Sequence, residues 1–341
     1  MPAEWAPHEA TWLSWPHNPE TWPDILVDAE RAMADAVAAL APHERVHINV
    51  LDDRHAEHVG RLLEGRVPEN AVRYERIPPD DAWIRDYGAI VVADEDGFVA
   101  LDFDYNAWGG KYPPFDRDRA VASQMADRLG LRRIARPMVL EGGSIDVNGE
   151  GLAIVTEQCL LNPNRNPGMN RGEIESCLAE TFGLTGILWL GEGVAGDDTD
   201  GHVDNLARFV DAERVVCAVA PDRSDVNHAP LDANLRRLEA FRDSEGRRLD
   251  VVELPLPDPV FRGDERLPAS YANFYIANSV VLMPAYGSPA DERARSILET
   301  CFPGREIVPI DCRALIVGLG ALHCLTQQIP VMVRDPIPTG N

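Results

Sequence analysis

The chain has 341 residues, of which 45% are hydrophobic and 26% are charged, enough for one large domain or two ordinary ones with a full core. Its 32 Lys and Arg stand against 56 Asp and Glu, and a net charge of -24 disfavours binding to nucleic acid or anionic membranes and favours cationic ligands. The acidic surface alternatively serves solubility alone. Without a long apolar run or a basic leader followed by an apolar segment, the sequence predicts a cytoplasmic protein with no membrane partner.

The cysteines argue against two other classes of protein. Their scattered positions include no CxxC pair, which disfavours both a disulfide framework and a zinc ribbon, so we expect reduced thiols. The six positions are Cys159, Cys177, Cys217, Cys301, Cys312 and Cys324.

Taken in order, the chain alternates predicted helices and strands. It opens with four of its seven tryptophans in residues 1–23, which either pack in a core or wall a pocket that faces a cation. Hydrophobic periodicity predicts helices over 28–40, 53–63, 117–131, 170–181 and 291–300, and strands over 12–15, 45–51, 152–156, 187–190, 206–210, 280–284 and 307–310. No Ser/Gly-rich linker interrupts this pattern, so we expect a single domain over residues 1–341.

Charged residues stand beside an aromatic at residues 81–86, just before an apolar strand. Trp83 and Asp86 are three apart, and together a flat ring and a carboxylate suit a planar cation such as guanidinium. The alternative is a surface ion pair between Arg85 and Asp86. Trp108 follows in a loop rich in glycine and aromatic residues.

A second polar motif, Glu141-Gly142-Gly143, precedes a predicted hairpin whose turn is Asn148-Gly149. It lacks the Lys-Ser/Thr of a phosphate loop, and its acidic neighbours would repel phosphate. A carboxylate with close backbone behind it is better placed to orient a neighbouring side chain.

The most polar stretch, residues 196–205, contains His202 and Asp204, which would share one face of a strand. A calcium loop is excluded, because a fixed glycine at Gly201 would place Gly196 and Ala207 at ligand positions one and twelve. A catalytic metal is disfavoured, since no HExxH or second nearby histidine completes a ligand set.

Cys324 follows the small residues of 318–321 and precedes an apolar run that includes Ile329, Val331 and Val333. A tight loop entering a buried strand would hold this thiol rigidly and open to one side, as a nucleophile requires. The alternative is a buried structural cysteine. Upstream, Asn273 begins another alternating stretch, where asparagines usually satisfy loop backbone.

These polar motifs recur about five times along the chain, each at the start of a strand. Repeated units of this kind suggest a radial arrangement around one shared site.

Taken together, the motifs identify a resemblance. Trp-x-Arg-Asp, Glu-Gly-Gly, Gly-His-Val-Asp, Asn-Phe-Tyr-Ile-Ala-Asn and His-Cys-x-Thr-Gln-Gln, with the opening Met-Pro-Ala-Glu-Trp-x-Pro-His, resemble the agmatine deiminases and their bacterial peptidylarginine-deiminase relatives in the guanidino-group-modifying pentein superfamily. The match runs in order from the first residues to about Pro330. It implies an α/β fold, a five-bladed α/β-propeller of ββαβ-type units, and a possible homodimer.

The resemblance also implies a reaction, in which a guanidinium is hydrolysed to a ureido group with release of ammonia through a covalent amidino-thiol. Carried over motif by motif, Cys324 is the nucleophile, His202 the acid/base, Asp86 and Asp204 hold the guanidinium nitrogens, and Glu141 orients His202. We also expect Trp83, Trp108, Asn273 and Gly142 to contact the substrate. Neither a metal nor an organic cofactor is required.

The leading hypothesis is hydrolysis of agmatine to N-carbamoylputrescine, in polyamine biosynthesis. Peptidyl-arginine, arginine or another small guanidine is the alternative substrate, and Arg85 and Lys111 are the obvious candidates to bind a substrate carboxylate. A non-catalytic guanidine or polyamine binder is a hypothesis of another class, although a binder would not need the thiol. A metallohydrolase is the weakest.

Overall fold

The computed structural model describes residues 1–95, 97–243 and 245–332. Val333, which we included in the apolar run after Cys324, lies outside the described residues. Four three-stranded sheets are built alike, each with an antiparallel pair followed by a parallel pair. Their strands are β4 (Ile90–Asp94), β5 (Gly97–Asp104) and β6 (Arg132–Val139); β7 (Ile145–Val147), β8 (Leu152–Thr156) and β9 (Gly186–Leu190); β10 (Ala207–Phe209), β11 (Arg214–Val219) and β12 (Asp250–Pro255); and β15 (Tyr275–Ile276), β16 (Val280–Ala285) and β17 (Glu306–Asp311).

A further sheet joins the two ends of the chain. Strand β18 (Thr326–Pro330) pairs antiparallel with β1 (His8–Ser14), which is followed by two parallel neighbours, β2 (Arg45–Asn49) and β3 (Val72–Glu75). The pattern of the other sheets is therefore repeated here from segments about 300 residues apart. A short hairpin of β13 (Phe261–Arg262) and β14 (Glu265–Arg266) lies outside this scheme.

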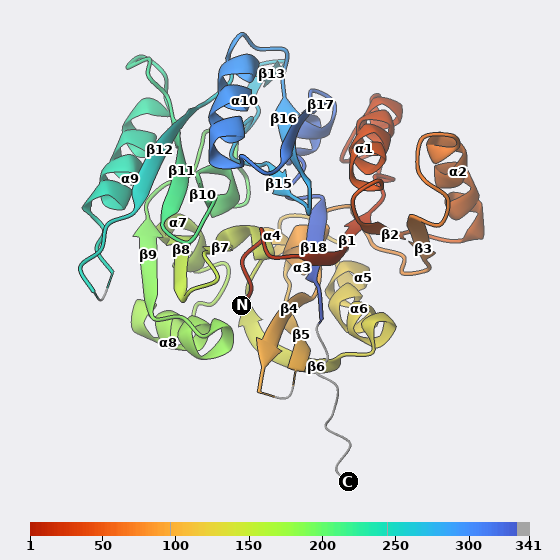
Figure 1. The fold of residues 1–341 in the computed structure, drawn as a ribbon, viewed down its shortest axis with the longest axis horizontal. Helices are drawn as coiled ribbons and strands as arrows, with labels where there is room; N and C mark the ends of the chain where they lie inside the picture. The colour runs from red at the N-terminus through yellow and green to blue at the C-terminus, as the bar shows by residue number, and fades with distance from the viewer. Residues whose placement is uncertain (96, 244, 333–341) are drawn as a thin grey trace.

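Helices lie around the outside of these sheets, as Figure 1 shows. The longer ones are α1 (Leu26–Leu40), α2 (Asp53–Leu63), α6 (Val121–Leu129), α8 (Arg171–Phe182), α9 (His228–Ala240) and α10 (Ala290–Cys301). Shorter helices are α3 (Ile84–Tyr87), α4 (Ala107–Gly110), α5 (Asp116–Arg119) and α7 (Glu157–Leu160), with 3-10 turns η1 (Gly142–Ser144), η2 (Val203–Asn205) and η3 (Leu315–Gly318). Helices α3 and α4, with β7 and β18, lie toward the middle (Figure 1).

Local signals place several of these helices correctly. The predicted range 53–63 is α2, whose N-cap Asp52 accepts from the backbone N–H of His55. Asn170 is the N-cap of α8 and forms a capping box with Glu173. The predicted helix 117–131 is instead divided at Ala120 into α5 and α6.

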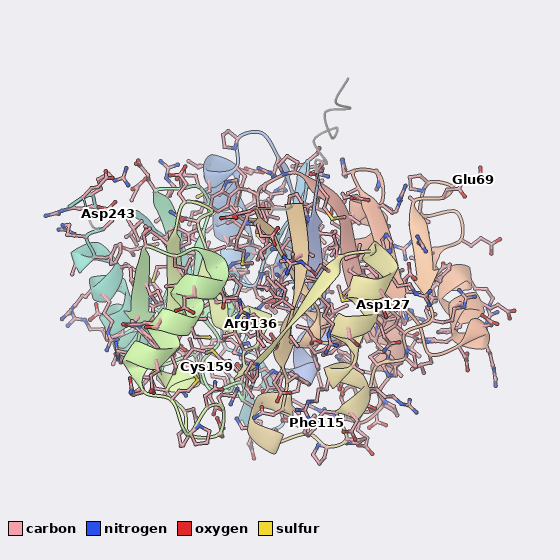
Figure 2. All side chains as sticks on the ribbon, turned by 90° about the horizontal axis from the view of Figure 1, so that it is seen from below. Glu69, Phe115, Asp127, Arg136, Cys159 and Asp243 are labelled. Carbon is pink, nitrogen blue, oxygen red and sulfur yellow. The ribbon has the colours of Figure 1, made fainter. Side chains whose placement is uncertain are left out.

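The N-terminal tryptophans belong to the core. Trp12, Trp15 and Trp22 have no exposed surface, which confirms core packing over a pocket wall for these three. Figure 2 shows packed side chains filling the molecule between Asp243 and Glu69, which lie at opposite edges. In the described ranges, no helix has the length and hydropathy needed to cross a membrane.

Each of the five polar motifs precedes the first strand of a sheet, as expected from the repetition. Asp86 lies on α3 before β4, Glu141 precedes η1 and β7, Asp204 lies in η2 before β10, Asn273 precedes β15, and Cys324 precedes β18. The fold therefore brings five distant segments to comparable positions in their sheets.

Candidate active site

Cys324 lies in the turn between η3 and β18 and is 7% exposed. Its thiol donates to Asp204 Oδ2 at 3.5 Å, and Asn273 Nδ2 donates to its sulfur at 3.1 Å. The small residues before it are required by close packing, because a Cβ on Gly320 would lie 2.4 Å from the Trp83 ring. Trp83 in turn packs against Trp22, with ring centroids 5.3 Å apart.

Three of the predicted side chains converge on the backbone of Gly143. A Cβ at this position would lie 2.6 Å from His202 Nδ1, 2.8 Å from Asp86 Oδ1 and 3.0 Å from Asp204 Oδ2. The motif glycine at the site is thus Gly143. Gly142 is packed against the carbonyl of Arg85, 2.2 Å from where its Cβ would be, and does not line the pocket that contains Cys324. Its contact with substrate remains a prediction.

The expected strand geometry of His202 and Asp204 is wrong, because residues 203–205 form η2 and β10 starts only at Ala207. His202 is instead the residue before a 3-10 turn, and Asp204 lies within it. The turn directs both side chains toward Gly143, so they do lie on one side, although not through the two-residue period of a strand.

Asp86 is held by two N–H donors. Its Oδ1 accepts from Gly143 N at 2.9 Å and its Oδ2 from Trp108 Nε1 at 3.0 Å. Burial raises the pKa of Asp86 to about 6, with a further increase from the Asp204 charge, although the His202 cation opposes the shift. Asp86 therefore titrates near neutrality.

His202 lies 3.7 Å from Asp86, measured between Nδ1 and Oδ1. Burial would lower the pKa of His202, but the nearby anions, first of all Asp86, raise it well above its usual value. The imidazole is therefore protonated at neutral pH and can act as an acid. By distance and angle neither ring nitrogen has a hydrogen-bond partner within the described ranges, but the Cys159 thiol is close enough to add to the increase in the His202 pKa.

Glu141 makes no hydrogen bond to His202 among the described residues, and its role in orienting His202 stays a prediction. Its Oε1 accepts from Arg165 Nε at 2.5 Å in a fully buried ion pair, while its negative charge adds to the increase in the His202 pKa. Sequence reasoning missed Arg165. The only signal was its place in the Asn- and Pro-rich loop at 162–167.

Cys159 was also missed as a neighbour of the site. One donor atom each of Glu141, Cys159 and His202 lies within 4.8 Å of the others, a set that resembles a metal site. The Arg165 guanidinium is already bonded to Glu141, and its positive charge opposes a cation there. The ion pair therefore disfavours a metal ion here, and Glu141 and Cys159 instead raise the pKa of His202.

The side chain of Cys324 is a protonated thiol in this environment. Burial raises its pKa well above the ordinary value, and the charges of Asp204 and Asp86 raise it further. A cation bound between the two carboxylates would reverse this effect by neutralising them.

A pocket of about 620 Å³ opens from Cys324 to the surface. Trp83, Asp86 and Trp108 line it together with Cys324, and its other lining residues include the acidic side chains of Glu20, Asp80, Asp81, Asp118 and Asp198. His202, Asp204 and Asn273 are not among the lining residues; they contact the groups that are.

The two candidate carboxylate-binding cations are already engaged. Arg85 is 4% exposed and does not pair with Asp86; it donates to Gln328 Oε1 and to the carbonyl of His323. Lys111 Nζ lies 3.0 Å from Asp200 Oδ1. The interpretation of a surface pair between Arg85 and Asp86 is therefore wrong, because Arg85 is buried on the other side of α3.

The family model for the Porphyromonas-type peptidyl-arginine deiminases matches residues 1–330, which includes every motif of the site. The chain belongs to this family. It is 38% identical to an agmatine deiminase of Ectopseudomonas mendocina, over 97% of this chain and 95% of that protein.

Solved structures agree with this family membership. An agmatine deiminase of C. jejuni with substrate bound has a TM-score of 0.89 and 33% identity, covering 98% of this chain and 96% of that one. An agmatine deiminase of Enterococcus faecalis has a TM-score of 0.91 and 30% identity, covering 97% and 95%. The family fold is a single α/β domain.

Proposed function

We propose that this protein is an agmatine deiminase, which hydrolyses agmatine to N-carbamoylputrescine and ammonia. The observation that carries the proposal is the placement of one thiol, Cys324, against two buried carboxylates, Asp86 and Asp204, at the base of an acid-lined pocket. A planar cation satisfies both carboxylates through its N–H groups, and agmatine carries that cation. The similarity to agmatine deiminases supports the same substrate.

The reaction follows from these charges. Binding of the guanidinium between Asp86 and Asp204 neutralises the anions that hold Cys324 as a thiol, so the thiol releases its proton to solvent through the pocket. The thiolate sulfur then attacks the guanidinium carbon, and the electron pair of one C–N π bond moves onto nitrogen. The C–N bond to the leaving nitrogen breaks as protonated His202 gives it a proton, and ammonia departs. Neutral His202 then takes a proton from water, whose oxygen attacks the amidino carbon and displaces the thiolate, which leaves the ureido product.

Two further groups have roles in this proposal. Glu141 keeps His202 cationic by its charge while Arg165 holds the carboxylate in place. Asn273 donates to the Cys324 sulfur, so it orients the nucleophile rather than the substrate tail.

The lining of the pocket supports agmatine over arginine. The lining includes the carboxylates of Glu20, Asp80 and Asp198, which attract a terminal amine, whereas Lys111 is paired with Asp200 and Arg85 lies outside the lining. The arginine of the lining, Arg262, donates to the Pro23 carbonyl at 3.3 Å, so a substrate carboxylate would have to compete with that bond or with the Lys111 pair. Polyamine biosynthesis is the corresponding metabolic setting that we propose.

The repeated sheets support a finer statement of the fold. Five sheets with the same order of antiparallel and parallel pairs, each preceded by a residue of the site, fit a five-bladed α/β-propeller. A homodimer and a cytoplasmic location remain predictions.

The test is ammonia release from agmatine, L-arginine and a short peptide ending in arginine, with wild type and Cys324→Ala side by side in the presence of a chelator. We expect turnover of agmatine alone and an inactive variant. Preference for another guanidine would overturn the substrate, activity of Cys324→Ala would overturn the thiol mechanism, and binding of agmatine without ammonia release would favour a binder.

A further inference from the structure

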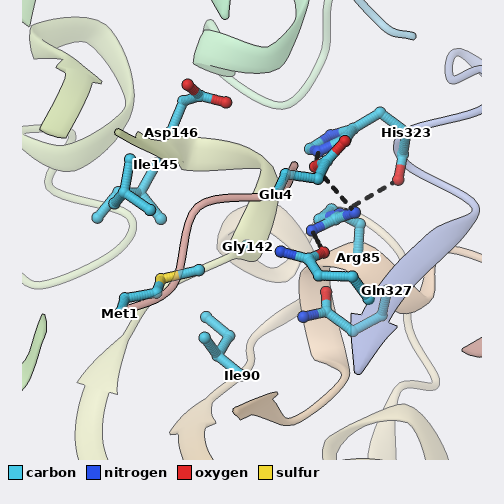
Figure 3. Close-up of a pocket in the computed structure, with 11 residues that line it drawn as sticks. Met1, Glu4, Arg85, Ile90, Gly142, Ile145, Asp146, His323 and Gln327 are labelled. Atoms are coloured by element: carbon cyan, nitrogen blue, oxygen red, sulfur yellow. Dashed lines mark hydrogen bonds and ion pairs between the residues drawn. The ribbon is translucent and has the colours of Figure 1, made fainter. Parts of the chain in front are cut away.

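Behind the nucleophile, His323 is clamped between two carboxylates. Its Nδ1 lies 2.8 Å from Asp204 Oδ2 and its Nε2 lies 2.9 Å from Glu4 Oε2. The three side chains are at most 8% exposed. Figure 3 shows the Glu4 carboxylate beside the His323 ring, on the wall of a cavity of about 20 Å³ that is separate from the pocket of Cys324.

This geometry specifies the charge of His323. An ionised carboxylate only accepts hydrogen bonds, so each ring nitrogen facing one must donate. A neutral imidazole has one N–H, and only the imidazolium has two. His323 is therefore a buried cation if both carboxylates are ionised.

The surroundings keep both carboxylates ionised. Burial alone would raise the pKa of Glu4, but the permanent charges of Arg208 and Arg85, together with the hydrogen bond from His323, lower it well below its usual value. Burial likewise opposes the ionisation of Asp204, yet a hydrogen bond from His323 and the nearby charges of His202 and Arg208 lower its pKa.

The position of Glu4 is itself fixed from several elements. Arg208 Nη2 lies 2.8 Å from Glu4 Oε2, and the backbone N–H of Ile276 donates to Oε1 at 2.8 Å. Arg208 also donates to Asp146 Oδ2 through Nε at 2.5 Å, so β10 and β15 hold Glu4 directly and β7 fixes the arginine that binds it. The Met1 amino group donates to the Phe182 carbonyl at 2.9 Å and ties down the start of that segment.

Asp204 Oδ2 is the oxygen that also accepts from the Cys324 thiol, at 3.5 Å. The bond from His323 thus restrains the oxygen that faces the nucleophile. Asp204 Oδ1 has no hydrogen-bond partner among the described residues, so it can accept from a substrate N–H.

We propose that Glu4 and His323 are positioning residues of the deiminase reaction: Glu4 holds His323 as an imidazolium, and that cation keeps the Asp204 carboxylate anionic and oriented toward Cys324. The inference rests on the proposed function for its kinetic consequences, but the charge state of His323 does not depend on it. The N-terminal segment thereby completes a site whose other residues lie far along the chain.

The first test measures the protonation of the two ring nitrogens of His323 directly. Protein labelled with ¹⁵N-histidine is compared as wild type, Glu4→Gln and His323→Gln at pH 7 without substrate, and the resonance lost in His323→Gln identifies His323 among the nine histidines. We expect two protonated ring nitrogens in wild type. In Glu4→Gln we expect one protonated and one unprotonated nitrogen, because the glutamine amide can donate to Nε2 while Nδ1–H still reaches Asp204. A neutral His323 in wild type would overturn the proposal.

The second test measures kinetics with agmatine. Loss of a hydrogen bond to a charged group predicts a decrease in kcat of about 10- to 100-fold for His323→Gln, and a smaller decrease for Glu4→Gln, which keeps the bond to Asp204. KM should change by less than about threefold, because Asp86 and the acidic mouth still bind the cation.

A matched control separates positioning from structural damage. His47 is a buried histidine whose Nδ1 lies 3.0 Å from Glu75 Oε1, and neither residue lines the pocket. His47→Gln removes a comparable pair and should leave kcat unchanged. Equal kcat losses in all three variants would overturn the positioning role. If His323→Gln fails to fold, the resonance that changes in Glu4→Gln identifies His323 instead.

The two proposals can fail separately. A wild-type protein that turns over no guanidine but contains the His323 imidazolium would overturn the proposed function. It would still support the charge that we infer for His323 between Glu4 and Asp204. An active enzyme with a neutral His323 would support the proposed function and overturn the positioning role of Glu4 and His323.

Discussion

The indole Nε1 of Trp108 donates a hydrogen bond of 3.0 Å to Asp86 Oδ2. To reach it, Trp108 takes a left-handed backbone conformation with φ 55°, as does Ala107 with φ 52°, which is costly for residues with side chains. The loop is therefore strained at the point where it supplies a donor to the Asp86 carboxylate.

Trp108→Phe keeps the ring but removes this donor. A hydrogen bond to a charged group contributes about 1.5–3 kcal/mol, so we expect kcat/KM for agmatine to fall by about 10- to 100-fold. Since the donor also lowers the pKa of Asp86, the acid limb of the pH profile should move to higher pH. Trp189→Phe is the matched control, because Trp189 Nε1 donates to Glu175 Oε1 outside the pocket. Equal losses in both variants would contradict the assignment.

The pH dependence of kcat/KM should report Asp86. Its pKa is raised to about 6 by burial, so the carboxylate is ionised above that pH and neutral below it. A neutral Asp86 cannot attract the guanidinium, and kcat/KM should fall below about pH 6, by up to about tenfold per pH unit. His202, whose pKa is raised well above its usual value, stays protonated through this window. A profile that is flat from pH 7 to pH 4.5 would contradict this prediction.

Reactivity of Cys324 should depend on the charge of the reagent. The Asp204 and Asp86 charges raise the thiol pKa, so neutral iodoacetamide should alkylate Cys324 slowly, and a haloalkyl amidine, which is a cation, should react faster. Asp204→Asn removes one anion, so it should speed the reaction with iodoacetamide and weaken the preference for the cation. Mass spectrometry of the peptide containing Cys324 gives both rates. Faster reaction of the neutral reagent with wild type would contradict the charge argument.

Gly143→Ala should abolish activity. Its Cβ would lie within 3.0 Å of His202 Nδ1, Asp86 Oδ1 and Asp204 Oδ2, so at least one of these groups must move. A displacement of this size in a reacting group costs about 100-fold or more in rate. Gly168→Ala is the control, since a Cβ there meets nothing within 4 Å. Ammonia release and thermal unfolding should be measured for both; an active Gly143→Ala enzyme would contradict the convergence of the three groups.

Asn170→Ala should reduce stability without affecting catalysis. Removal of the capping box of α8 costs about 1 kcal/mol in the free energy of unfolding. Helix α8 contributes no residue to the pocket, so kcat/KM should be unchanged. Urea unfolding measures the expected loss of stability, and agmatine kinetics measure the expected unchanged kcat/KM. A loss of activity at unchanged stability would contradict the prediction.

Much of the secondary structure could be predicted because its signals are local. Capping residues and apolar periodicity identify α2 and α8 to within a residue or two. The turn at His202 could not be predicted, because the sequence alternation before β10 fits a strand equally well and only the packing of η2 decides. The same holds for the division at Ala120.

By itself, the sequence determined the reactive residue types, their order and the family, since the thiol, the imidazole and the carboxylates lie in motifs that can be read locally. Only the tertiary structure decided which neighbours charge and orient them. Arg165 on Glu141, Trp108 on Asp86 and Glu4 on His323 are pairs separated by 24, 22 and 319 residues, and no local pattern encodes such pairs. They arise when the sheets bring distant segments together and exclude water, because a buried charge must then find a partner within the protein.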